Sequence, residues 1–219
     1  DKVGQTGLAV ILVENDGSNR IIVYPGANMR ISEGDVESAF TCCPDAVMAQ
    51  LESGEDVAVY ASQLAADEAI PFILDGGGAR SDFRLNKLAK VDIFSPNEIE
   101  TALITGIRPD TLDDCLRASM AICSQTDVRY VVLKLGARGC YVYDGKYCDL
   151  IAPFVVQAVD TTAAGDAFTA ALATEFLRTG DITASARYAN AVGALTVTTA
   201  GAIHSLPTRE TVRRFLEQI

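Results

Sequence analysis

The sequence predicts an α/β protein in three layers, with a mostly parallel sheet between helices and a small β-hairpin ahead of it. From residue 45 onward, short apolar segments of strand length alternate with longer segments whose apolar residues recur at helical spacing. That alternation is typical of a parallel sheet covered by helices on both faces. Ahead of it, two β-branched runs flank the turn-forming sequence Asp16-Gly17-Ser18-Asn19, which favours a hairpin.

The individual elements are expected in chain order from these patterns. Residues 7–13 and 20–24 are the strands of the first hairpin, and Asp144-Gly145 marks the turn of a second one that extends the main sheet. Gly180-Asp181 and residues 201–207 interrupt the helical pattern of the C-terminal third. The other strands are expected at 45–51, 71–75, 91–95, 129–135, 139–143 and 146–151, and the helices at 55–69, 98–105, 112–126, 164–179, 182–198 and 208–218.

The charge balance and hydropathy exclude some classes of partner. The 219 residues include 29 acidic and 18 basic side chains, giving a net charge of −11, without a run of Lys or Arg. Nucleic-acid binding normally requires a basic surface, so we expect no nucleic-acid partner. The apolar stretches are shorter than a bilayer span and the N-terminus lacks a signal pattern, so we expect a cytoplasmic protein without membrane contact. Because the chain starts at Asp1, we also expect it to be cropped from a longer protein.

The cysteines indicate neither a disulfide framework nor a zinc site. They form no CxxC pair, and His204 is the only histidine. We therefore expect reduced, mostly buried thiols. The six are Cys42, Cys43, Cys115, Cys123, Cys140 and Cys148.

The most informative segment is 159–168, where small residues lead directly into a helical run. The start of a helix presents unpaired N–H groups and the positive end of its dipole, which suits a phosphoryl group. Asp166 would lie in the first turn, where it can accept a proton from an attacking hydroxyl group. On these residues alone, Asp160, Thr161 and Asp166 could equally serve to cap the helix.

Residues 160–166, Asp-Thr-Thr-Ala-Ala-Gly-Asp, resemble the Asp-Thr-x-Gly/Ala-Ala-Gly-Asp signature of the ribokinase and phosphofructokinase-B type carbohydrate kinases. Residues 97–100, Asn-Glu-Ile-Glu, are similar to the Asn-x-x-Glu element of that family, and residues 134–139, Lys-Leu-Gly-Ala-Arg-Gly, to its nucleotide-binding strand and turn. Asn190 and residues 201–207 resemble its C-terminal adenine and cation elements. Three motifs in the family's order outweigh the capping interpretation. The resemblance spans essentially the whole chain and implies a ribokinase-like, Rossmann-like fold.

The resemblance also implies roles for individual residues. Asp166 would be the base that deprotonates the sugar hydroxyl, and the backbone of Ala163, Ala164, Gly165 and Asp166 would form the anion hole for the γ-phosphoryl group of ATP. The other positions divide by ligand. Asn97 and Glu100 would organise Mg²⁺ and phosphate, Arg138 would approach the phosphates, and Lys134, Gly136, Gly139 and Asn190 would line the nucleotide. For Asn97 and Glu100 the alternative is a helix start with an acidic first turn, and Gly136 and Gly139 could be plain turn glycines.

The family often binds a monovalent cation beside the anion hole. Oxygen ligands with one carboxylate suit a hard cation such as K⁺, although Na⁺ or an empty loop are alternatives. A lone histidine inside this loop, His204, is better interpreted as a surface or packing residue. The positions that the resemblance implies are Asp160, Thr162, Thr196, Thr199, Gly201 and Ser205.

The sugar side has fewer matches. The resemblance implies that Glu52 touches the sugar, with an exposed strand-end carboxylate as the alternative. Residues 1–28 would be part of a β lid that covers the sugar and joins two copies as a homodimer, and residues 29–219 the nucleotide-binding catalytic domain. The family's N-terminal Gly-Gly-x-x-x-Asn sugar motif is absent. Residues 75–78 read Asp-Gly-Gly-Gly where ribokinases usually have Asn-Pro-Ala-Pro, and we expect the glycines to change the stiffness of that loop and its contribution to the sugar site.

The sequence therefore predicts an ATP-dependent kinase of a small sugar, with a pentose such as ribose as the leading acceptor. The alternatives are a kinase of the same family that acts on fructose, ketodeoxygluconate or a nucleoside, and a nucleotide-binding fragment without catalytic activity.

Overall fold

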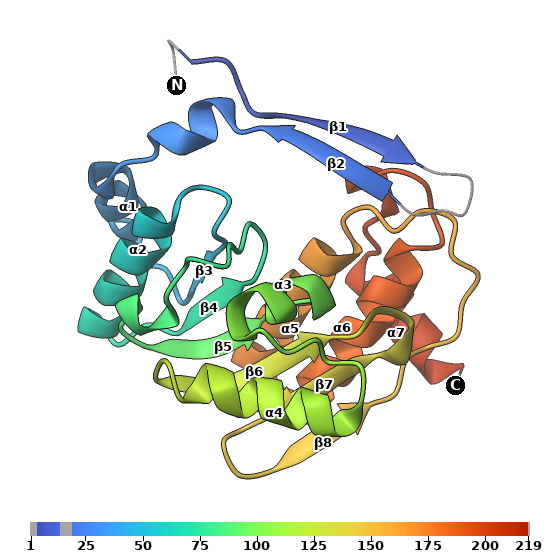
Figure 1. The fold of residues 1–219 in the computed structure, drawn as a ribbon. Coiled ribbons are helices and arrows are strands. Elements are labelled where there is room, and N and C mark those ends of the chain that lie inside the picture. Colours follow the sequence, from blue (N-terminus) through green and yellow to red (C-terminus); the bar gives the residue numbers. More distant parts are fainter. Residues whose placement is uncertain (1–3, 14–18, 219) are drawn as a thin grey trace.

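A computed structural model describes residues 4–13 and 19–218. The described strands form two separate sheets (Figure 1). Strands β1 (Leu8–Val13) and β2 (Asn19–Tyr24) pair antiparallel as the expected first hairpin. Most of its expected turn, Asp16 to Ser18, lies outside the described residues.

The main sheet has the strand order β3-β4-β5-β6-β7-β8. The pairs from β3 to β6 are parallel, whereas β7 and β8 continue the sheet as an antiparallel hairpin, so the expected mostly parallel sheet is confirmed. The strands are β3 (Val47–Ala49), β4 (Phe72–Asp75), β5 (Val91–Ser95), β6 (Val128–Lys134), β7 (Cys140–Tyr143) and β8 (Cys148–Ile151).

Helices cover both faces of this sheet, which gives the predicted three layers (Figure 1). Neighbouring residues of a buried strand belong to opposite faces: Leu133 is part of the apolar cluster that includes α2 and α4, and Val132 is part of the cluster that includes α5, α6 and α7. Strands that are buried on both faces explain the continuous apolar runs in the sequence. The helices are α1 (Glu33–Phe40), α2 (Glu55–Asp67), α3 (Glu98–Thr105), α4 (Leu112–Cys123), α5 (Ala164–Thr179), α6 (Ile182–Thr196) and α7 (Arg209–Glu217).

Helix α1 was not expected from the sequence. It begins with a capping box in which Ser32 and Asp35 each accept a hydrogen bond from the other's backbone N–H group. Only Val36 and Phe40 are buried, and the helix packs against α2. Its narrow apolar stripe explains why hydropathy periodicity missed it, although the Ser-x-x-Asp pattern was a usable signal.

The expectation of mostly buried cysteines was wrong. Cys115 and Cys140 are buried and Cys123 is partly buried, but Cys42, Cys43 and Cys148 are exposed. Cys42 and Cys43 lie in the turn after the missed helix α1, which explains the error there. All six are free thiols, as expected. None of the helices in the described part of the chain combines the length and apolar character of a membrane span.

Candidate active site

Polar side chains gather where the parallel strands end. Asp75 is the last residue of β4, and Lys134 is the last residue of β6. Between these strands, β5 ends at Ser95 and leads through Pro96 into α3. The carboxyl ends of parallel strands are where open α/β sheets bind ligands. The N-terminus of α5 reaches the same place, because a Cβ atom at Gly165 would lie only 3.7 Å from Lys134 Nζ.

The first turn of α5 is open for an anion. Ala163, the residue before the helix, has a left-handed backbone (φ 62°), and no side chain caps the helix. Within the described part of the chain, the N–H groups of Gly165 and Asp166 have no hydrogen-bond partner. Free N–H groups at a helix N-terminus attract a phosphoryl group. The capping interpretation of Asp160, Thr161 and Asp166 is therefore not borne out at α5.

Asp166 is the third residue of α5 and its side chain is accessible from the open side of the site. Partial burial raises the pKa of its carboxyl group, the negative charge of Asp75 raises it further, and the positive charge of Lys134 opposes both. The pKa of Glu52 is also raised, by partial burial and then by the charges of Asp166 and Asp75. Three carboxylates therefore lie within electrostatic reach of one another, with Lys134 as their nearby cation.

Asn97 and Glu100 form a capping box at the start of α3. The Asn97 side chain accepts hydrogen bonds from the N–H groups of Ile99 and Glu100, and both Glu100 oxygens accept hydrogen bonds from Asn97 at 2.7 Å. Burial raises the pKa of Glu100, and Lys134 is the largest opposing influence. The structural alternative for these two residues is therefore present. With both oxygens engaged, Glu100 would hold Mg²⁺ through water rather than directly.

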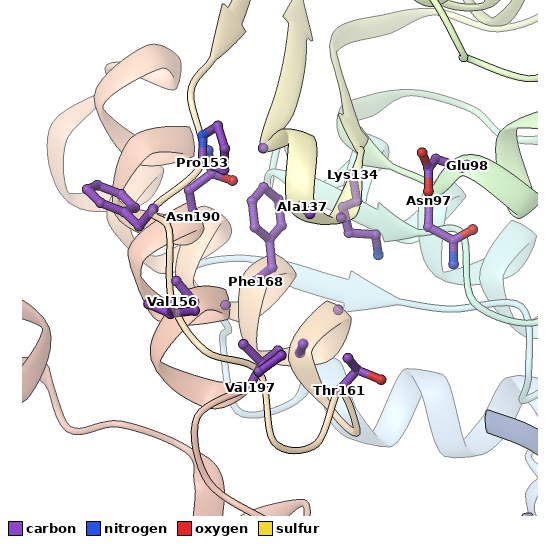
Figure 2. Close-up of a pocket in the computed structure, with 18 of the residues that line it drawn as sticks. Asn97, Glu98, Lys134, Ala137, Pro153, Val156, Thr161, Phe168, Asn190 and Val197 are labelled. Carbon is purple, nitrogen blue, oxygen red and sulfur yellow. The ribbon is translucent and has the colours of Figure 1, made fainter. Parts of the chain in front are cut away.

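A cavity of about 630 Å³ adjoins these residues (Figure 2). Lys134 and Asn97 line one end of it. Pro153, Val156 and Asn190 line the other end, and Phe168 lies between the two ends. A polar end beside a helix N-terminus and an apolar end suit a nucleotide, whose phosphates and base have those characters.

The other residues assigned to the nucleotide differ in whether they line the cavity. Gly136 and Gly139 line the cavity, and a side chain at Gly139 would overlap the backbone of Ile151. Asn190 also lines it, but its amide donates hydrogen bonds to the carbonyl groups of Ile151 and Ala152, so this side chain holds the cavity wall. Arg138 is not among the described lining residues.

The guanidinium group of Arg138 points elsewhere. It forms an ion pair with Glu98 at 2.6 Å and donates hydrogen bonds to the carbonyl groups of Pro109 and Asp110. These contacts hold the turn after β6 against α3 and the loop before α4. The expected approach of Arg138 to the phosphates is therefore not seen in this arrangement.

Three of the residues assigned to a monovalent cation, Asp160, Thr162 and Gly201, are joined by hydrogen bonds. Asp160 accepts hydrogen bonds from the N–H groups of Thr162 (2.9 Å) and Gly201 (2.8 Å), which join the loop before α5 to the loop after α6. The hydrogen bonds from Gly201 and Thr162 lower the pKa of Asp160, so its carboxylate stays charged. Thr196 and Ser205 are buried and bond to nearby carbonyl groups, and Thr199 and His204 are exposed.

The glycine loop after β4 connects Glu52, which the sequence assigned to the sugar, to this site. The N–H group of Leu51 donates to the carbonyl group of Gly77 at 2.8 Å, and a Cβ atom at Gly77 would lie 3.6 Å from Glu52 Oε1. A Cβ atom at Gly76 would lie 2.5 Å from Glu100 Oε2. The loop of residues 75–78 is therefore packed closely between the carboxylates of Glu52 and Glu100. Its glycines permit this close packing and do not loosen the loop.

Asp75 and Thr169 were not assigned to the site from the sequence. Asp75 Oδ2 accepts a hydrogen bond from Lys134 Nζ at 2.6 Å and another from the Thr169 hydroxyl group. The position of Asp75 at the carboxyl end of a predicted parallel strand was a usable signal. Thr169 gave no signal, because a threonine within a helix is unremarkable in sequence and only the packing of α5 on β4 brings it to Asp75.

The fold and the site define an α/β protein in which an uncapped helix N-terminus, suited to an anion, carries a carboxylate in its first turn. The model of the pfkB family carbohydrate kinases matches residues 1–209, and the chain belongs to this family. The resemblance noted in the sequence is thereby confirmed.

Individual relatives support the same family. The chain is 33% identical to a ribokinase of Arabidopsis thaliana over 97% of its own length and 57% of the relative, and 32% identical to a ribokinase of Haemophilus influenzae over 97% and 69%. It thus spans little more than half of the Arabidopsis protein. A solved structure of Arabidopsis thaliana ribokinase complexed with ribose and ATP is similar with a TM-score of 0.86 and 32% identity, covering 98% of this chain and 70% of that one.

Proposed function

We propose that this protein is an ATP-dependent sugar kinase that transfers the γ-phosphoryl group of ATP to a hydroxyl group of a pentose, with ribose as the leading acceptor. The single observation that carries this proposal is the position of Asp166. It stands in the first turn of α5, next to free N–H groups and beside a cavity with one polar and one apolar end. A proton acceptor next to an anion hole is what phosphoryl transfer to a hydroxyl group requires.

In the proposed reaction, the phosphates of ATP lie at the Lys134 end of the cavity and the base at the Pro153 end. Asp166 takes the proton of the sugar hydroxyl as its oxygen bonds to the γ-phosphorus. The bond from that phosphorus to the β-γ bridging oxygen breaks, and ADP leaves. The N–H groups of Gly165 and Asp166 stabilise the charge on the transferred group. Glu52 would hold the sugar, whose phosphorylated product is ribose 5-phosphate when ribose is the acceptor.

Two cations complete the proposal. Mg²⁺, held by Glu100 through water, would neutralise charge on the ATP phosphates. A monovalent cation, K⁺ in our proposal, would bind among the carbonyl and side-chain oxygens of the 160–162 and 196–205 loops. The fixed carboxylate of Asp160, held by Thr162 and Gly201, gives that region a negative charge next to the anion hole.

We assign residues 1–28 to a lid over the sugar and residues 29–219 to the catalytic domain. The apolar side chains of β1 and β2 are largely exposed, including Leu8 and Ile22 at 61% and 62%. Such a sheet favours pairing with a second copy, so we propose a homodimer through the hairpin. The net charge of −11 argues against a nucleic-acid partner. We propose that the reaction takes place in the cytoplasm, without membrane contact.

Sugar-dependent release of ADP tests this function. The chain would be incubated with ATP, Mg²⁺ and K⁺ and with ribose, deoxyribose, fructose, ketodeoxygluconate or a nucleoside in turn. The proposal expects the highest kcat/KM for ribose. A higher value for another acceptor would replace ribose with that acceptor. Binding of ADP without sugar-dependent release would instead support the alternative of a nucleotide-binding fragment.

A further inference from the structure

Asp75 lies where three parts of the site meet. Its Oδ2 atom accepts hydrogen bonds from Lys134 at the end of β6 and from Thr169 in α5. Its Oδ1 atom accepts a hydrogen bond at 2.9 Å from the N–H group of Gly77, whose carbonyl group binds Leu51, the neighbour of Glu52. One carboxylate is thus tied to the nucleotide wall, the catalytic helix and the sugar-side loop.

Apart from Asp75, the Lys134 ammonium group has one hydrogen-bond partner among the described residues, Thr169. The side chains of Lys134 and Asp75 are only 10% and 13% exposed, and the second hydrogen bond of Lys134 Nζ, to Thr169, is long at 3.4 Å. A mostly buried ammonium group needs a counter-charge, and Asp75 supplies it. Thr169 in turn reaches the carbonyl group of Gly165 at 3.2 Å, so the same cluster fixes the start of α5.

We propose that Asp75 is a positioning residue for phosphoryl transfer: it holds the Lys134 ammonium group beside the N-terminus of α5, so that the positive charge faces the γ-phosphoryl group. Asp75 does not touch the substrate in this proposal and acts through Lys134. The proposal rests on the proposed kinase function and deepens it, because it names the group that places the site's cation. Asp75 opens the sequence Asp-Gly-Gly-Gly at residues 75–78, so the same residue ends β4 and begins the loop that reaches Glu52.

The positions of the neighbouring charges determine whether the pKa of Asp166 rises or falls in each variant. The charged groups that act on Asp166 are Glu52 from the loop after β3, Asp75 from β4 and Lys134 from β6. Removing the negative charge of Asp75 lowers the pKa of Asp166, and removing the positive charge of Lys134 raises it. The base must be ionised to accept a proton, so the acid limb of the kcat profile moves to lower pH in Asp75→Asn and to higher pH in Lys134→Met.

The decisive experiment compares the intact chain with Asp75→Asn, Lys134→Met and the double variant. Affinities for ADP and for a non-hydrolysable ATP analogue, both with Mg²⁺, would be measured by calorimetry, and kcat and KM where turnover is present. Either single variant is expected to weaken binding of the analogue by about 10-fold relative to ADP, because one charge-assisted contact to the γ-phosphoryl group is lost. We expect kcat to fall roughly 10- to 100-fold in Asp75→Asn, the size of loss seen when a residue that orients a metal ligand is replaced.

The double variant separates positioning from a general effect on stability. If Asp75 acts through Lys134, removing Asp75 after Lys134 has no further cost, so the double variant binds the analogue no worse than Lys134→Met. The neutral pair also removes the unpaired buried charge that could unfold a single variant. If the losses of analogue affinity in the two single variants multiply in the double variant, the proposal is overturned. An unchanged preference for the analogue over ADP in Asp75→Asn would do the same.

An ion pair away from the site, with a buried carboxylate and a half-exposed lysine, provides the control. Asp92, on β5 away from its carboxyl end, is paired with Lys90 at 3.3 Å. The double variant Lys90→Met/Asp92→Asn is expected to lower the melting temperature without changing the ratio of analogue to ADP affinity. If the intact chain lacks sugar-dependent turnover, the proposed function fails, but the affinity ratios still decide the role of Asp75.

Discussion

The two ends of the proposed reaction are built very differently in this molecule. On the phosphoryl side, strand ends and helix starts are tied together by hydrogen bonds among mostly buried residues such as Asp75, Lys134 and Thr169. On the sugar side, Glu52 and the side chains of the β1–β2 hairpin are exposed. Under the proposed function, the main sheet and the start of α5 organise the phosphoryl side, and the sugar side is the more open part of the site in the described residues.

The largest expected contrast is in stability. Phe94 is fully buried in the main sheet, so Phe94→Ala is expected to lower the free energy of unfolding by about 3–5 kcal/mol. Ile22 in the hairpin is 62% exposed, so Ile22→Ala should change it by less than about 0.5 kcal/mol. Urea unfolding at low protein concentration measures both. Equal losses would show that the hairpin belongs to the same core.

The next effect tests the junction between the two sides. Gly76→Val would force a side chain against the Glu100 carboxylate and the backbone of Pro96, and we expect a loss of roughly 1–3 kcal/mol and weaker nucleotide binding. Gly34→Ala is the matched control, because the nearest atom to its new Cβ is 3.8 Å away in the exposed helix α1. Calorimetric melting and titration with ADP measure both variants. A neutral Gly76→Val would contradict the tight packing of this loop.

A smaller expected effect distinguishes a contact of Glu52 with the sugar from a contact with the nucleotide. Glu52→Gln is expected to raise the KM for ribose roughly 10-fold, since a hydrogen bond to a charged group is replaced by a neutral one, while the KM for ATP stays the same. Glu68→Gln, at the exposed end of α2, is the control. A parallel rise in both KM values would assign Glu52 to the frame of the site instead of the sugar.

The smallest expected effect concerns the strained residue before α5. Ala163 has a φ angle of 62°, which costs a non-glycine residue about 1–2 kcal/mol. Ala163→Gly relieves that strain but gives the unfolded chain more freedom, so we expect a net change within about 1 kcal/mol and an unchanged kcat. Thermal melting and initial rates measure the two quantities. Loss of activity would mean that the methyl group of Ala163, and not only the backbone, serves the anion hole.

Most of the fold could be predicted from sequence because the sheet is buried on both faces. Strand β5 and helices α3 and α5 have the predicted bounds, where apolar runs, Asn97 and Gly180 mark their ends. Helix α1 was missed because few of its residues are buried, and residues 45–51 contain a strand of only three residues, Val47–Ala49. Local patterns identify elements when burial and capping agree.

The site, like the fold, could be predicted only where local sequence patterns mark the residues. The motifs placed Asp166, Gly165 and Lys134 together, because each lies at a strand end or a helix start that topology brings to one edge of the sheet. Sequence could not show that Asp75 pairs with Lys134, which is 59 residues away along the chain. It also could not show that Glu98 holds Arg138 away from the cavity. Such long-range contacts depend on side-chain packing and leave no local pattern.

The central claim is that Asp166 is the base of a sugar kinase. It is tested most directly by measuring phosphorylated ribose formed by the intact chain and by Asp166→Asn, with Asp113→Asn in the exposed first turn of α4 as control. The account predicts a loss of roughly 10²- to 10⁴-fold in kcat for Asp166→Asn, unchanged ADP affinity, and normal turnover in the control. Undiminished formation of the sugar phosphate by Asp166→Asn would contradict it.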